Sequence, residues 1–264
     1  MTEKHSHPTG IGAYRPDEIA ARIEEAGVGK TKLNLVQALA LSVLAGVFIA
    51  FGAAFYTQVM SGVDTAFGPA RLLGGAAFSL GLILVVVGGA ELFTGNALMV
   101  MAWVDRRITT KALLRAWVIV FFGNLIGALA MALLVYFSGS LSGAVGDLAV
   151  RIAETKMALP PVEALLRGIL CNALVCLAVW LTFAASTVTG RILAILWPIT
   201  AFVALGFEHS IANMYLIPVG ILAGAEGGLA LFVGNLLPVT LGNIIGGAGG
   251  VALAYWAAYR RLPD

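Results

Sequence analysis

GFEHSIANM, at positions 206–214, lies inside a long apolar stretch that runs from about residue 190 to residue 223. Glu208 and His209 are ionisable, and an ionisable side chain deep in a membrane is costly unless it is paired or hydrogen-bonded. The stretch is also longer than the roughly 20 residues that cross a bilayer core about 30 Å thick. We therefore expect the span to be interrupted beside His209, with the half-helix Ser210–Leu222 following the break.

The composition around this stretch is that of a membrane protein. Of the 264 residues, 60% are hydrophobic and only 11% are charged. Soluble domains carry about 25% charged residues, so we exclude a soluble fold. The net charge of +2 and the absence of a basic cluster argue against nucleic-acid binding. Lipid is the expected solvent.

Six apolar stretches are long enough to cross a bilayer. They cover residues 33–60, 69–104, 111–138, 161–185, 190–223 and 227–259. The second and fifth are too long for one straight helix, so both are expected to be broken. A short helix is expected at Ala144–Met157 in the connector between the third and fourth stretches. These features predict an all-α membrane protein with six transmembrane helices.

The distribution of Lys and Arg sets the expected orientation. Twelve of them fall on the side that holds both termini, and four (Arg71, Arg151, Lys156 and Arg167) fall on the other. Positive loops stay in the cytoplasm, so both termini of this multi-pass protein should be cytoplasmic, in a bacterial inner membrane. We expect a cytoplasmic tail over 1–32, one transmembrane domain over 33–259 and a short tail over 260–264.

The first tail lacks the apolar core of a signal peptide and contains a predicted amphipathic helix. It begins near Pro16 and places an apolar stripe opposite Glu24 and Glu25. Such a helix either anchors the inner mouth or gates it. Cys171 and Cys176 are five residues apart in one apolar stretch, and we expect no disulfide between them.

The two halves of the chain resemble each other. GNLIG at 123–127 returns as GNIIG at 242–246, 119 positions later, and the pair Glu91 and Asn96 returns as Glu208 and Asn213, 117 positions later. Because three spans per half is an odd number, the halves must cross the membrane in opposite directions. This predicts an inverted 3+3 repeat with a substrate path near the midplane.

The polar residues at these echoes are candidates for structural support of the helix breaks. Glu91 and Glu208 are interpreted as acceptors for backbone N–H groups freed at the breaks, since a carboxylate does not attract an anion. Amide side chains supply both donors and acceptors for the same task. Those expected to hold the breaks are Asn96, Asn213, Asn124 and Asn243.

His209 is the candidate site residue. A lone buried His is often only a satisfied core residue, but this one directly precedes a half-helix whose N-terminus favours negative charge. It could donate a proton or a hydrogen bond to a small anion. Thr94, at the matching break in the second span, could hold the ring or the substrate with its hydroxyl.

Apolar side chains flank both breaks and are expected to form a narrow ring: Phe78, Leu82, Leu92, Phe93 and Phe202. Such a ring bars a bare anion because stripping its water is costly, whereas a neutral acid passes more easily. The alternative is that these side chains are ordinary packing residues.

At these positions the chain resembles the formate/nitrite transporter family. The resemblance is carried by GAELFTG at 89–95, GFEHSIANM at 206–214 and PVTLGNIIGG at 238–247, and it extends from about residue 16 to the end. It implies an aquaporin-like protomer in a homopentamer, with one pore per protomer and a central His209–Thr94 pair.

The resemblance also assigns expected places to pathway residues. Phe78, Leu82 and Leu92 would constrict the inner mouth, and Phe202 with the Asn172–Val175 face would lie toward the outer mouth. Lys156 would attract anions to the outer vestibule, and Asn243 would help to hold the loop that carries Thr94.

The expected function is passage of a small monovalent anion, linked to protonation. Residues 237–240 and the pair Tyr255–Trp256 look most like the formate branch of the family, whereas Thr94-Gly95-Asn96 is closer to nitrite-type members. Formate is therefore the first expected substrate, with nitrite or hydrosulfide as the alternative and a neutral-solute channel as a weaker one. No catalytic motif is present in the spans, and we expect no enzyme activity, no cofactor and no metal site.

Overall fold

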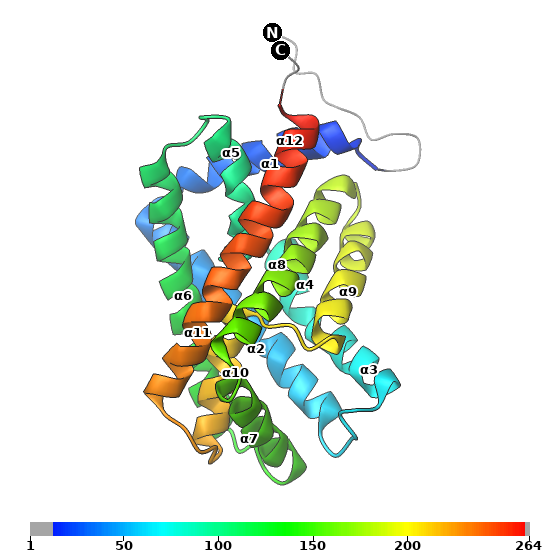
Figure 1. Cartoon of the computed structure of the whole chain (residues 1–264), viewed down its shortest axis with the longest axis vertical. Coiled ribbons are helices and arrows are strands. Elements are labelled where there is room, and N and C mark those ends of the chain that lie inside the picture. The colour runs from blue at the N-terminus through cyan, green and yellow to red at the C-terminus, as the bar shows by residue number, and fades with distance from the viewer. Residues whose placement is uncertain (1–12, 262–264) are drawn as a thin grey trace.

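The computed structural model describes residues 13–261, and this part of the chain is helical, without a β-strand. The helices form one elongated bundle (Figure 1). Its elements are α1 Pro16–Thr31, α2 Leu35–Met60, α3 Gly68–Phe78, α4 Leu80–Gly88, η1 Gly95–Met99, α5 Val100–Val104, α6 Thr110–Phe137, α7 Ala144–Met157, α8 Pro161–Ala184, α9 Val188–Ala204, α10 Ser210–Leu222, α11 Leu229–Ile244, the π-helix η2 Ile245–Ala252 and α12 Leu253–Tyr259.

The two expected helix breaks are present. Within residues 13–261, five helical stretches are long and apolar enough to cross a membrane, namely 35–60, 68–88, 110–137, 161–184 and 229–259. The expected second span divides into 68–88 and the shorter 95–104, and the expected fifth divides into α9 and α10. The half-helix α10 and the connector helix α7 have the predicted bounds. The count of six crossings treats each divided stretch as one span and remains a prediction.

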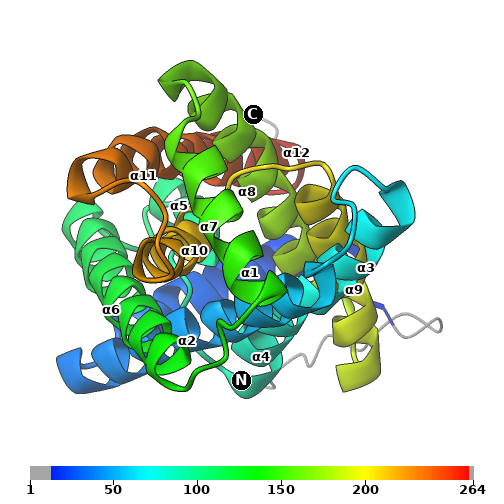
Figure 2. The same ribbon diagram turned by 90° about the horizontal axis from the view of Figure 1, so that it is seen from below.

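Two short helices close the ends of the bundle. The helix α1 lies across the end where α12 finishes, and α7 lies at the opposite end (Figure 1). In the view from below, α7 lies beside α10, against which it packs (Figure 2). We refer to these two ends as the α1 end and the α7 end.

Glycines allow two helix pairs to approach closely. A Cβ added to Gly127 on α6 would lie 2.1 Å from the Val43 carbonyl oxygen on α2, and one added to Gly246 would lie 2.0 Å from the Ile169 carbonyl oxygen on α8. Real side chains do not fit at such distances, so only glycine permits these contacts. The two GNxxG stretches therefore serve as close-packing surfaces between helices.

The helix α1 packs onto the bundle through more of its surface than its sequence pattern predicted. Ile19, Ala20 and Ile23 are buried, as expected for the apolar stripe. However, Glu24 was placed on the polar face, and its side chain is fully buried. The guanidinium of Arg260, after the last helix, donates to both carboxylate oxygens of Glu24 at 2.8 and 2.9 Å. An ion pair between distant parts of the chain therefore holds α1 in place.

Candidate functional site

The first break begins at Gly89, which ends α4. Its φ of +82° lies in the left-handed region that suits glycine. The Asn124 side chain on α6 then holds the loop: its Oδ1 accepts from the Phe93 N–H at 3.0 Å, and its Nδ2 donates to the Glu91 carbonyl at 2.9 Å. Nδ2 also donates to the Ser42 carbonyl on α2 at 2.7 Å. One buried amide thus satisfies three backbone groups.

The second break has the same construction. Gly206, with a φ of +73°, ends the turn after α9. The Asn243 Oδ1 accepts from the Ser210 N–H at 2.9 Å, and its Nδ2 donates to the carbonyls of Glu208 at 3.0 Å and Gly168 at 2.8 Å. Corresponding groups in the two loops are 117 positions apart, as between Gly89 and Gly206. The hydrogen bonds at the two breaks therefore correspond one to one, and the inverted repeat of the whole chain remains a prediction.

The two loops meet at Thr94 and His209. The Thr94 Oγ1 lies 3.0 Å from the His209 Nε2, and both side chains are buried. The His209 Nδ1 caps α10 by accepting from the Ala212 N–H at 3.1 Å. A ring nitrogen that accepts has no proton, so the proton of the neutral ring is assigned to Nε2. Nε2 then donates to Thr94, which leaves the Thr94 hydroxyl proton available to a ligand.

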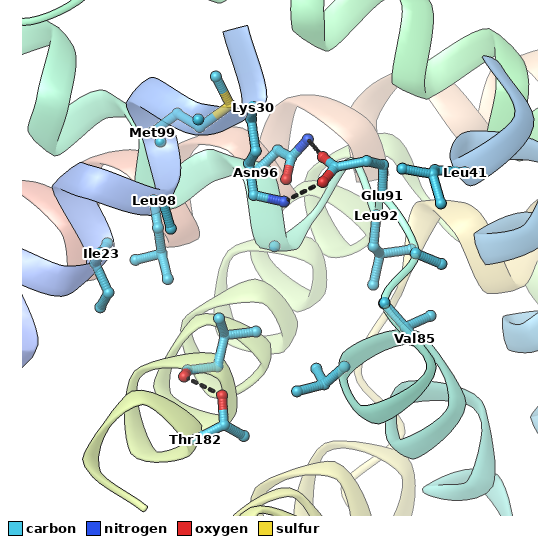
Figure 3. Close-up of a pocket in the computed structure, with 18 of the residues that line it drawn as sticks. Ile23, Lys30, Leu41, Val85, Glu91, Leu92, Asn96, Leu98, Met99 and Thr182 are labelled. Carbon is cyan, nitrogen blue, oxygen red and sulfur yellow. Dashed lines mark hydrogen bonds and ion pairs between the residues drawn. The ribbon is translucent and has the colours of Figure 1, made fainter. Parts of the chain in front are cut away.

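Each buried carboxylate at a break is paired with a lysine and an asparagine. Glu91 accepts from the Lys30 Nζ at 2.6 Å and from the Asn96 Nδ2 at 2.9 Å (Figure 3). These partners differ from the expected backbone N–H groups, which the amides of α6 and α11 satisfy instead. A buried carboxylate with a cationic and a neutral donor is well satisfied.

The second carboxylate has equivalent partners. Glu208 accepts from the Lys156 Nζ at 2.8 Å and from the Asn213 Nδ2 at 2.7 Å. Lys156 was expected to face an outer vestibule. Its ion pair with Glu208 instead holds it against the protein, and 15% of its side chain is exposed. Its charge acts on the site as part of an ion pair.

A pocket of about 430 Å³ opens under α1. Figure 3 shows Lys30, Asn96 and Glu91 converging at one side of it, above the apolar side chains of Leu92 and Val85. Leu82 also lines this pocket. The site therefore has a polar group at the α1 end and an apolar wall toward the centre.

A smaller pocket of about 100 Å³ lies at the α7 end. Lys156 and Glu208 line it together with five residues that carry rings, namely Tyr56, Phe78, Phe202, Phe207 and His209. The Phe202 ring lies 5.6 Å from the Phe78 ring and 5.9 Å from the His209 ring, measured between centroids. Apolar side chains thus stand on both sides of the Thr94–His209 pair.

Phe78 and Phe93 lie elsewhere than expected. Phe78 was placed with Leu82 at one mouth, but it lies in the opposite pocket, because one helical turn carries it about 6 Å along the axis. Phe93 lines neither pocket, since its ring packs against those of Trp117 and Phe121 on α6 at 6.0 and 5.1 Å.

The Asn172–Val175 face also differs from its expected position at the outer mouth. Neither side chain lines one of the two pockets, and both are buried within the bundle. Asn172 instead donates to the backbone carbonyl of Thr94 at 3.2 Å. It therefore belongs to the support of the central pair.

Lys30 and Asn235 were missed by the sequence reasoning. Lys30 lies near the end of α1, just as Lys156 lies near the end of α7. If the predicted repeat had included these two short helices, Lys30 would have been identified as the counterpart of Lys156. Asn235 accepts from the Asn213 Nδ2 at 2.7 Å and donates to the Lys156 carbonyl at 2.8 Å. No echo marks Asn235 in the sequence. Among the described residues, no cluster of His, Cys, Asp and Glu could hold a metal ion.

Comparisons with known proteins agree with this architecture. Residues 17–257 match the model of a family described as formate/nitrite transporter. The chain is 41% identical to the formate channel FocA of Escherichia coli (strain K12), over 94% of this chain and 95% of that one. A solved structure described as an FNT family ion channel superposes with a TM-score of 0.86 at 30% identity, over 91% of this chain and 98% of that chain. Another, a pentameric formate channel with formate bound, gives 0.80 at 38% identity, over 86% and 98%.

Proposed function

This chain belongs to the formate/nitrite transporter family, and we propose that it is a channel that carries formate across the membrane. The observation that carries the proposal is the buried Thr94–His209 hydrogen bond, which joins two broken helices between a pocket at each end. Broken helices at membrane depth are a recurring way to build a site for a small ion. The relatives named as formate channels support formate as the substrate.

The charged groups at both pockets suit the entry of an anion. Lys30 and Lys156 each supply three N–H donors, and the bond to a glutamate uses only one of them. The remaining donors can attract a monovalent anion to either end. The start of α10, at Ser210, adds a dipole that favours negative charge near the centre.

The apolar walls then oppose the passage of a bare anion. Leu82 and Leu92 stand on the α1 side of the central pair, and Phe78 and Phe202 stand on the α7 side. Removing water from an anion is costly in such surroundings, so formate should cross as the neutral acid. Net movement is then coupled to protons, and uptake should be faster when the outside is more acidic.

The proton comes either from His209 or from a water relay. If the His209 ring is to donate a proton and be neutral afterwards, it must first carry protons on both nitrogens. Protonation of Nδ1 requires the loss of its hydrogen bond from the Ala212 N–H. The geometry therefore favours a water relay, with His209 acting through Thr94 as a hydrogen-bond donor. Formate uptake that is unchanged in His209→Ala, at matched protein levels, would contradict either role.

We extend the proposal to the setting of the channel. The chain is a multi-pass membrane protein, and the loop charges favour a bacterial inner membrane with both termini in the cytoplasm. The likeness to a pentameric formate channel favours a homopentamer in the lipid bilayer, with a pore in each protomer. No catalysis is proposed.

Nitrite is the competing substrate that Gly95 and Asn96 after Thr94 favour, and hydrosulfide is a further alternative. The experiment is uptake of labelled formate into proteoliposomes, with unlabelled nitrite, hydrosulfide, lactate and glycerol as competitors. Saturable uptake that formate itself blocks best supports the proposal. Stronger competition by nitrite or hydrosulfide would assign a different substrate to the same pore. Transport of glycerol alone would identify a neutral-solute channel instead.

A further inference from the structure

Besides the Thr94–His209 hydrogen bond, a side chain on α8 links the first loop to the asparagine that clamps the second loop. Asn172 is fully buried, and its Nδ2 donates to the carbonyl of Thr94 at 3.2 Å and to the carbonyl of Asn243 at 2.6 Å. Thr94 is in the first loop, and Asn243 holds the second through Ser210 and Glu208. One amide group thus spans the interface between the two breaks.

The first half of the chain lacks this connection. The two clamping asparagines bind the carbonyls of Ser42 on α2 and Gly168 on α8, which are 126 positions apart. This offset relates equivalent positions on the two helices. The residue 126 positions before Asn172 is Gly46, where a Cβ would lie 2.1 Å from the Asn124 carbonyl oxygen. The first clamp therefore works with no side chain at this position. The amide of Asn172 is an addition that the clamp itself does not require.

A second donor from the same helix reaches the same carbonyl. Cys176 lies one turn after Asn172, and its Sγ is 3.5 Å from the Thr94 carbonyl oxygen. Gly247 makes room for both: a Cβ there would lie 2.3 Å from the Asn172 Nδ2 and 2.8 Å from the Cys176 Sγ. The π-helix η2, which contains Gly247, therefore packs closely against both donors.

We propose that Asn172 is a positioning residue that sets the direction of the Thr94 hydroxyl at the central pair. The inference rests on the proposed function, because its effect is read through the passage of formate. The Asn172 amide fixes the Thr94 backbone, and the Thr94 Oγ1 on the same residue meets the His209 Nε2 at 3.0 Å. A shift of the carbonyl moves the hydroxyl away from both the ring and the passing ion.

The amide orientation makes the role specific. Both N–H groups of Asn172 point to carbonyls, and its Oδ1 has no hydrogen-bond partner among the described residues. Leucine branches at the same atom as asparagine but is larger and has no donor. Asn172→Leu therefore removes the two bonds, and the strain from its added volume acts in both backgrounds of the test below.

The test is a double-mutant cycle between Asn172→Leu and Thr94→Val, with formate uptake into proteoliposomes normalised to folded protein. With Thr94 present, Asn172→Leu should lower uptake about 10-fold or more and raise KM, as expected for a misplaced site group. In the Thr94→Val background, where no hydroxyl remains to be placed, it should change uptake by less than about twofold. An equal loss in both backgrounds, or wild-type uptake and KM in Asn172→Leu, would overturn the proposal.

A milder pair of variants decides the matter if Asn172→Leu does not fold or uptake by the double variant is too low to measure. Cys176→Ala removes the second donor to Thr94, and Cys176→Ser restores one. Cys171→Ala is the matched control, since Cys171 is equally buried on α8. Reduced uptake in Cys176→Ala alone supports the proposal, and equal uptake in all three contradicts it. Wild-type uptake is measured first in each preparation, because its absence would refute the proposed function rather than this inference.

Discussion

Replacement of Asn243 by alanine should disrupt the second helix break. The substitution removes the partner of three buried backbone groups: the Ser210 N–H and the carbonyls of Glu208 and Gly168. Each such group costs about 1–3 kcal/mol when it is left without a partner. Even the lower figure gives a loss of about 3 kcal/mol, which corresponds to a fall in Tm of roughly 6–12 °C for a chain of this size.

The assay is thermal unfolding of the purified protein in detergent, followed by formate uptake for the folded fraction. Asn124→Ala removes three equivalent bonds at the first break and should produce a similar loss. The contrast is Asn34→Ala, which removes a single cap bond to the Gln37 N–H at an exposed helix start and should cost about 1 kcal/mol. If Asn243→Ala melts at a temperature no lower than that of Asn34→Ala, the proposed clamping of the second break by Asn243 is refuted.

Two further variants probe the helix contacts and the docking of α1. Gly246→Ala places a Cβ 2.0 Å from the Ile169 carbonyl oxygen and should cost about 1–3 kcal/mol in thermal unfolding, whereas Gly234→Ala, with open space around it, should not. Burial raises the pKa of the Glu24 carboxyl above its ordinary value, although the hydrogen bond from Arg260 lowers it. Because the folded state then binds this proton at higher pH than the unfolded chain does, wild type should gain stability relative to Glu24→Gln as the pH falls from about 7.5 to about 5. A relative loss of Tm over that range would show that the sign is wrong.

Local sequence patterns predicted the half-helix α10 and the connector helix α7 with their observed bounds. The roles of Asn124 and Asn243 as clamps were also predictable, because each stands in a GNxxG echo opposite a break. The choice of loop for Asn243 was wrong, because its side chain holds the loop that carries His209 and not the loop that carries Thr94. A buried amide beside a broken helix needs hydrogen-bond partners, and the free backbone groups at the break supply them, so its role follows from its position.

Contacts between residues that are far apart in the sequence could not be predicted from local patterns. Glu24 has the spacing of a solvated residue, and its burial is explained by its ion pairs with Arg107 and with Arg260, which is 236 positions later. The position of Phe78 relative to the central pair depends on where the second span breaks, and a single turn decides between the two pockets. The π-helix at 245–252 has no local signal beyond its glycines, which let η2 pack closely against α8.

Passage at the Thr94–His209 pair is tested most directly by formate uptake into proteoliposomes at two external pH values, by wild type and by Thr94→Val. Wild type should show saturable uptake that is faster at the more acidic pH. Thr94→Val should lose about 10-fold or more of this uptake, and its Tm should stay close to that of wild type because valine keeps the shape of threonine. Wild-type vesicles that take up no small acid, or equal uptake by the two proteins at both pH values, would contradict the claim that anions pass at the Thr94–His209 pair.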